Sequence, residues 1–84
     1  MTQVPMDKDL ALDLISTKLR EIKSKIEAIL KKWGQNSIKT MIQLSREGKL
    51  PESEMDAISL TNLNDKMVEL KSLAQDLEEK SFQL

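Results

Sequence analysis

The sequence predicts an all-α fold, a long antiparallel helical hairpin with a short connecting helix, in a single domain over residues 1–84. Three observations carry this prediction. Apolar residues recur every three or four positions along two long stretches, which is the pattern of a helix face. The two glycines stand between these stretches, where each can end a helix. The composition is 39% hydrophobic, 32% charged and only 2% aromatic, which suits long helices better than a β sandwich.

The first predicted helix, residues 6–33, carries the most regular apolar pattern of the chain. Its large apolar residues are spaced as the a and d positions of three heptads: Leu12, Ile15, Leu19, Ile22, Ile26, Ile29 and Trp33. Pro5 and the acidic residues that follow it favour a start near Met6, and Gly34 supplies the stop. This seam needs a partner helix, because each large aliphatic side chain gains about 1.5–3 kcal/mol on full burial.

The second predicted helix, residues 37–47, is short. Either Asn36 or Ser37 can cap its N-terminus, and Gly48 ends it. Its apolar residues are Ile38, Met41, Ile42 and Leu44.

The third predicted helix, residues 52–80, has two alternative starts. Pro51 suits the first helical position, or Ser53 caps the helix with Asp56 in a variant of the capping box. Its apolar residues again fall at three and four positions: Leu60, Leu63, Met67, Leu70, Ala74 and Leu77. Further apolar residues widen this face: Met55, Ile58, Val68 and Leu73.

Both long helices carry more apolar surface than a contact between two helices would cover. Leu10, Leu14 and Leu30 lie outside the seam of the first helix, and the second helix can reach only the end near Trp33. A domain of this size commonly gains stability by association. We therefore expect two hairpins to form a homodimer, a four-helix bundle with two-fold symmetry. The predicted interface residues are Leu10, Leu12, Leu14, Ile15, Leu19, Ile22, Ile26, Ile29, Trp33, Leu63, Met67, Leu70, Leu73 and Leu77.

Trp33 has two interpretations. Tryptophan is enriched among residues that anchor interfaces. Trp33 also continues the heptad series, so it could close the turn of the hairpin against the second helix.

Charge is distributed unevenly along the chain. Residues 18–32 hold six basic and two acidic side chains, whereas residues 51–80 hold eight acidic and three basic ones. In the heptad frame the lysines at 18, 25 and 32 are g positions, but the acids of the third helix fall on outer positions, so no flanking salt bridge is predicted. The basic side chains form either a surface for nucleic acid or a solvated helix face: Lys18, Arg20, Lys23, Lys25 and Lys32.

The residue types argue against catalysis. The chain has no His, Cys or Tyr, so the usual general bases, thiol nucleophiles and nitrogen ligands for metals are absent. The acidic cluster of Glu52, Glu54 and Asp56 lacks the pattern of a calcium loop, and the dipole at the helix N-terminus explains it. We expect no enzyme activity, no cofactor, no metal and no small-molecule substrate. Without a basic and then apolar leader or a long apolar run, the sequence predicts a cytoplasmic protein that does not enter membranes.

The order of segments between Leu12 and Leu77 resembles that of small archaeal and bacterial antitoxin-like proteins. A heptad helix ends at residues 31–34 (Lys-Lys-Trp-Gly), a short helix follows, and the turn at 47–54 (Glu-Gly-Lys-Leu-Pro-Glu-Ser-Glu) leads into a second amphipathic helix. The resemblance implies that an apolar helix face lies along a partner toxin and neutralises it. The chain departs from the family pattern in having Trp33 as its aromatic residue and no DNA-binding arm before the first helix.

The sequence thus predicts a non-enzymatic protein interaction module that self-associates through amphipathic helices. The alternative is an antitoxin-like or chaperone-like binder of another protein. A second alternative is nucleic-acid binding through the basic helix face, which would weaken steeply with salt.

Overall fold

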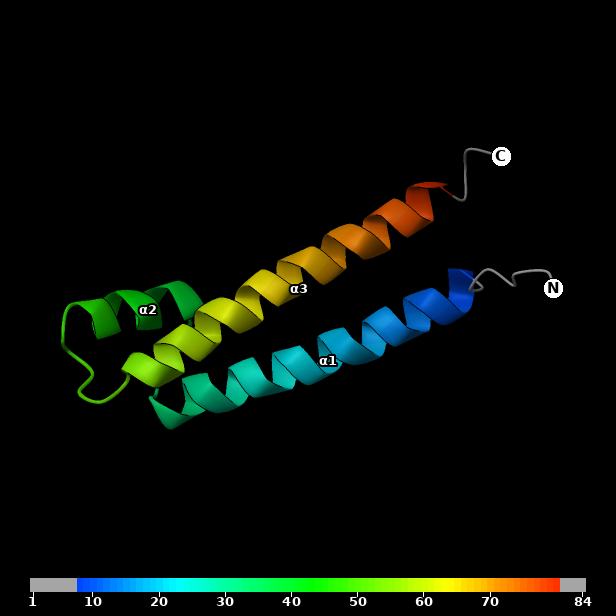
Figure 1. Ribbon diagram of the computed structural model, residues 1–84. Coiled ribbons are helices and arrows are strands. Elements are labelled where there is room, and N and C mark those ends of the chain that lie inside the picture. Colours follow the sequence, from blue (N-terminus) through cyan, green and yellow to red (C-terminus); the bar gives the residue numbers. More distant parts are fainter. Residues whose placement is uncertain (1–7, 81–84) are drawn as a thin grey trace.

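The computed structural model describes residues 8–80, and the predicted start near Met6 lies outside this range. Three helices follow one another: α1 (Lys8–Lys32), α2 (Ile38–Arg46) and α3 (Glu54–Lys80) (Figure 1). α1 and α3 lie side by side and antiparallel, and the short α2 packs beside the first half of α3 (Figure 1). The predicted all-α hairpin is therefore confirmed. We call the end that holds α2 the closed end and the opposite end the open end.

Both glycines end helices, as the sequence predicts. Gly34 has φ of 66°, and the next residue, Gln35, donates its backbone N–H to the Leu30 carbonyl at 2.8 Å. Gly48 has φ of 73°, and Lys49 donates in the same way to the Leu44 carbonyl at 2.9 Å. Each pattern is a Schellman motif, in which a left-handed residue lets the chain reverse and satisfies the last carbonyls of the helix.

The starts of α2 and α3 resolve two alternatives. Ser37 caps α2, because its Oγ accepts the backbone N–H of Thr40 at 3.3 Å. α3 begins at Glu54, directly after Ser53, so the prediction that Pro51 opens this helix is wrong. Pro51 and Glu52 are instead the central residues of a turn in which Ser53 N–H donates to the Leu50 carbonyl at 3.2 Å. A proline followed by a residue with positive φ is the signature of a type II turn.

Glu52 is the one described residue other than glycine with a positive φ, at 65°. This conformation costs a residue with a Cβ about 1–2 kcal/mol. Because glycine adopts it freely but has more backbone entropy to lose, Glu52→Gly is expected to stabilise the fold by roughly 0.5–1 kcal/mol. Urea denaturation of both chains measures this change. Glu54→Gly, in the first turn of α3, is the matched control and is expected to destabilise, since glycine is a poor helix former.

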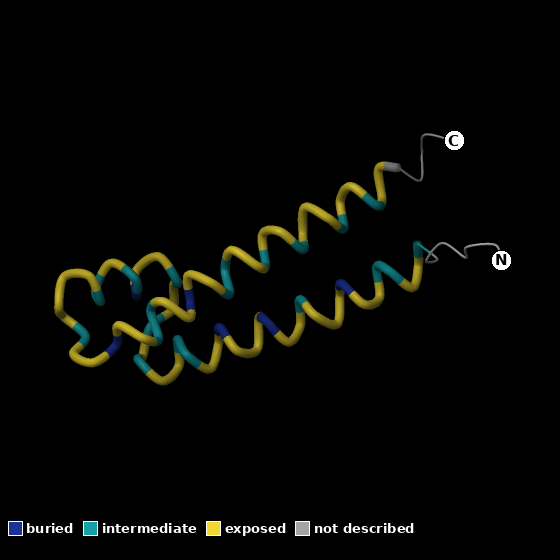
Figure 2. Tube along the Cα trace, viewed as in Figure 1, coloured by how far each residue is buried: buried dark blue, intermediate teal, exposed yellow. Residues whose placement is uncertain are grey.

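The core lies at the closed end. Ile22 and Ile26 of α1, Met41 of α2 and Leu60 of α3 form one buried cluster, to which all three helices contribute. Figure 2 shows that the buried residues of α2 and α3 lie in this half of the molecule and that Ile15 is buried further along α1. The predicted seam of α1 is the covered side of the helix, because each of its seven residues is buried or half-buried. None of the helices described between residues 8 and 80 is long and apolar enough to cross a membrane.

Candidate protein interaction surface

The predicted interface residues divide into two groups in the structure. Those of the α1 seam, together with Leu63, Met67, Leu70 and Leu77 of α3, are buried or half-buried within the hairpin itself. Three leucines remain about half exposed: Leu10 at 51%, Leu14 at 53% and Leu73 at 48%. Leu30, expected to need an outside partner, instead packs half-buried against the core cluster. The surface left for a partner is therefore smaller than predicted and lies toward the open end.

The three exposed leucines lie on one side of the hairpin. A shallow groove at the closed end shows which sides of the two long helices meet there, because it is lined by Lys25, Ala28, Ile29, Ser59, Asn62 and Leu63. Leu10 is 18 residues from Ala28, which is five full turns of helix, and Leu14 is 11 residues from Lys25, close to three turns. Leu73 is 11 residues from Asn62, so it also continues the line of the groove.

The register of the hairpin brings these leucines to the same level. Lys32 of α1 contacts Asp56 of α3 at the closed end. Eighteen residues back along α1 is Leu14, and 18 residues forward along α3 is Ala74, next to Leu73. Since both helices rise about 1.5 Å per residue, Leu14 and Leu73 lie level with each other. We call the surface of Leu10, Leu14, Leu73 and the half-buried Leu70 and Leu77 the leucine face.

Polar contacts hold the closed end together around Asp56, which the sequence offered only as a capping residue. Trp33 donates its indole N–H (Nε1) to Asp56 Oδ2 at 2.8 Å, and Lys32 Nζ lies 3.0 Å from the same oxygen. Lys32 Nζ also lies 5.6 Å from the centre of the Trp33 ring. The Lys32 pair corrects the prediction that no flanking salt bridge forms. Trp33 is half-buried and packs against the core cluster, as its interpretation as a plug of the closed end expects.

The same contacts determine the charge of Asp56. The hydrogen bond from Trp33, followed by that from Lys32, holds the pKa of the Asp56 carboxyl below its ordinary value. Within residues 8–80 no three acidic side chains are grouped so that they could hold a metal ion. Of the predicted acidic cluster, Asp56 thus serves as an acceptor between α1 and α3.

The Asp56 contacts predict an acid-sensitive closed end. Because the folded pKa is lowered, their stabilisation is present above the ordinary aspartate pKa and is lost as the pH falls through the lowered value. Urea midpoints between pH 6 and pH 2.5 are expected to fall less for Asp56→Asn than for the unmodified chain. Trp33 fluorescence reports the local change, since the chain holds one tryptophan. Asp65→Asn, at an exposed position of α3, is the control and should retain the full pH dependence.

A second contact fastens the start of α3 to the end of α2. Ser53 has no exposed surface, and its Oγ donates to the Leu50 carbonyl at 2.6 Å and lies 2.8 Å from Ser45 Oγ. Sequence reasoning offered Ser53 as an N-cap residue, but not as a buried one. The flanking Pro51 and the small side chain of Ser45 were the available signals.

The predicted basic residues do not form one surface. Lys18 pairs with Glu21 at 3.6 Å and Lys32 pairs with Asp56, so two of the g positions have acidic partners. Lys23 lies about 140° around α1 from Lys18, since each residue advances the helix by about 100°. Arg20 and Lys25 line a shallow outer hollow of α1 together with Glu21. The basic charge of α1 is thus spread around the helix and interrupted by acids.

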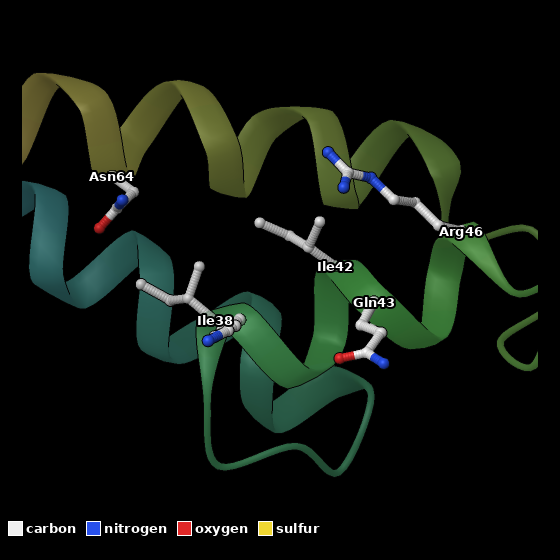
Figure 3. A pocket seen from close by; sticks show the side chains of 6 residues that line it. Ile38, Ile42, Gln43, Arg46 and Asn64 are labelled. Carbon is white, nitrogen blue, oxygen red and sulfur yellow. The ribbon is translucent and has the colours of Figure 1, made fainter.

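Another hollow lies between α2 and α3. It is lined by Ile38, Lys39, Ile42, Gln43, Arg46 and Asn64, and Figure 3 shows Ile42 and Arg46 extending from α2 toward α3. A neighbouring hollow shares Ile42 and Arg46 and includes Ile58, which is 57% exposed. Val68, also 57% exposed, lies about 80° around α3 from Leu60, on the side of Asn64. These residues are turned away from the leucine face.

Comparisons with protein-family models, with curated proteins and with solved structures find no match for this chain. The resemblance to antitoxin-like proteins therefore stays a prediction. What the arrangement can do has to be argued from its exposed apolar side chains.

Proposed function

We propose that this protein is a non-enzymatic interaction module that associates with a second copy of itself through the leucine face. The observation that carries the proposal is the alignment of Leu10, Leu14 and Leu73, three half-exposed leucines from two helices, on one side of the hairpin. Burial of apolar surface is favourable at about 25 cal/mol per Å², and the hairpin alone does not achieve it here. Large apolar patches exposed on small proteins mark interaction sites.

The size of the available side supports a stable contact. The two long helices span about 40 Å at 1.5 Å per residue, and the molecule measures 22 Å in its second dimension. A side of these dimensions offers roughly 800 Å² per copy, the area that one partner buries in a standard protein interface. The small core of the closed end gives a reason for association, because it leaves the open half of the hairpin weakly buried.

Light scattering over a concentration series tests the proposal. The unmodified chain is expected to be a dimer, and Leu14→Lys/Leu73→Lys is expected to be a monomer of unchanged helix content by circular dichroism. The matched control is Ile58→Lys/Val68→Lys, because these residues are equally exposed on α3 but lie away from the leucine face. The control should stay dimeric. An unmodified chain that is monomeric at all concentrations would contradict self-association and favour a heterologous partner, as an antitoxin-like binder would require.

A further inference from the structure

The side of the hairpin that carries the leucine face also carries two ion pairs. Lys18 and Glu21 of α1 pair at 3.6 Å, and Lys66 and Glu69 of α3 pair at 3.9 Å. Lys18 follows Leu14 by four residues and Lys66 precedes Leu70 by four, so each lies one turn from the leucine face on the same side of its helix. All four side chains are at least half exposed. A second copy placed on this side would therefore meet them.

The register places the two ion pairs at the same level of the hairpin. Counting 14 residues back from Lys32 reaches Lys18, and counting 14 forward from Asp56 reaches Leu70, next to Glu69. Counting 11 residues in the same way brings Glu21 level with Met67, next to Lys66. Along the long axis, the base of α1 is thus level with the acid of α3, and the acid of α1 with the base of α3.

Two copies can stack on this side with a two-fold axis either along or across the hairpin. With the axis along the hairpin, α1 of each copy lies on α3 of the other, and residues at the same level face each other. Lys18 then faces Glu69 of the other copy, Glu21 faces Lys66, and the leucine faces meet. With the axis across it, α1 lies on α1, which brings Lys18 and Lys25 of opposite copies together and moves the leucine faces to opposite ends.

Overall charge favours the first arrangement. α1 holds seven basic and four acidic residues, a net charge of +3, and α3 holds three basic and seven acidic residues, a net charge of −4. Stacking α1 on α3 joins opposite charges, whereas stacking α1 on α1 joins like charges, which costs affinity. We propose, resting on the self-association proposed above, that two copies pair about an axis along the hairpin, with α1 on the partner's α3 and both closed ends at the same end of the dimer.

Charge exchange tests this arrangement at constant net charge. Lys18→Glu/Glu21→Lys keeps the pair within α1 but sets like charges against Lys66 and Glu69 of the other copy. The dimer Kd in low salt is expected to rise about tenfold, since four favourable or neutral contacts become repulsive at up to about 1 kcal/mol each. Adding Lys66→Glu/Glu69→Lys to the same chain should restore the Kd to within about threefold. Arg20→Glu/Glu27→Lys, exchanged on the outer side of α1, is the control and should leave the Kd unchanged.

A distance measurement provides the second arm. The chain has no cysteine, so Asn36→Cys introduces a single site for a spin label in the exposed loop at the closed end. The proposed dimer places both labels at one end, at a separation well below the ~40 Å length of the long helices. A separation of ~40 Å or more, or a Kd that falls after the α1 exchange, would overturn the arrangement while leaving self-association intact. A monomeric unmodified chain would overturn both proposals.

Discussion

Ile22→Asp is expected to unfold the hairpin. Ile22 is 3% exposed and belongs to the cluster in which all three helices meet. A carboxylate there would be buried without a partner, and such a change typically costs more than about 4 kcal/mol. A protein of this size has a free energy of unfolding of only about 5–10 kcal/mol. Circular dichroism with urea denaturation should show lost helix content or a transition at much lower urea concentration.

Ser24→Asp provides the control for this variant. Ser24 is exposed, lies two residues further along α1 and receives the same side chain, so helix propensity and net charge change in nearly the same way. Its free energy of unfolding should stay within about 0.5 kcal/mol of the unmodified chain at equal chain concentration. If Ile22→Asp behaved like Ser24→Asp, the seam of α1 would not be the buried side of this helix.

Leu60→Ala is expected to have the next largest effect. Leu60 has no exposed surface and is the residue of α3 in the core cluster with Met41 and Ile26. Removing its side chain beyond Cβ leaves a cavity, and comparable changes in other cores cost about 2–5 kcal/mol. Urea denaturation measures this loss, and the slope of the transition shows whether unfolding stays two-state.

Ile58→Ala is the matched control on the same helix. Ile58 lies two residues before Leu60 and is 57% exposed, so its truncation removes little buried surface. Alanine is also the better helix former, and the expected change is within about 0.5 kcal/mol of zero. Equal effects of the two variants would mean that α2 and α3 do not pack as described, because only that packing distinguishes the two positions.

The helices themselves could be predicted because their signals are local. The heptad spacing from Leu12 to Trp33 identified the covered side of α1, and two glycines marked the helix ends by a conformation that other residues avoid. The start of α3 could not be decided locally. Pro51 and Ser53 both fit rules for helix starts, and the choice depends on the type II turn and on the burial of Ser53 beside Ser45.

The candidate surface could be predicted only in part. Sequence reasoning found that apolar residues lie outside the seam, but it grouped Leu30 with Leu10 and Leu14. Their difference in burial arises because Leu30 packs with the core cluster at the closed end, whereas no element reaches the other two. A helical pattern gives the direction of a side chain, but not the presence of a neighbour in that direction.

By itself the sequence determined that the chain is a helical hairpin, where its helices stop and which side of α1 is covered, because periodicity and capping act over a few residues. The tertiary structure decided which surface is left for a partner and how the closed end is held. Asp56 is 23 residues from Trp33 and meets it only because the antiparallel register brings them together. The leucine face likewise arises because that register aligns Leu14 with Leu73, residues that are far apart in the chain.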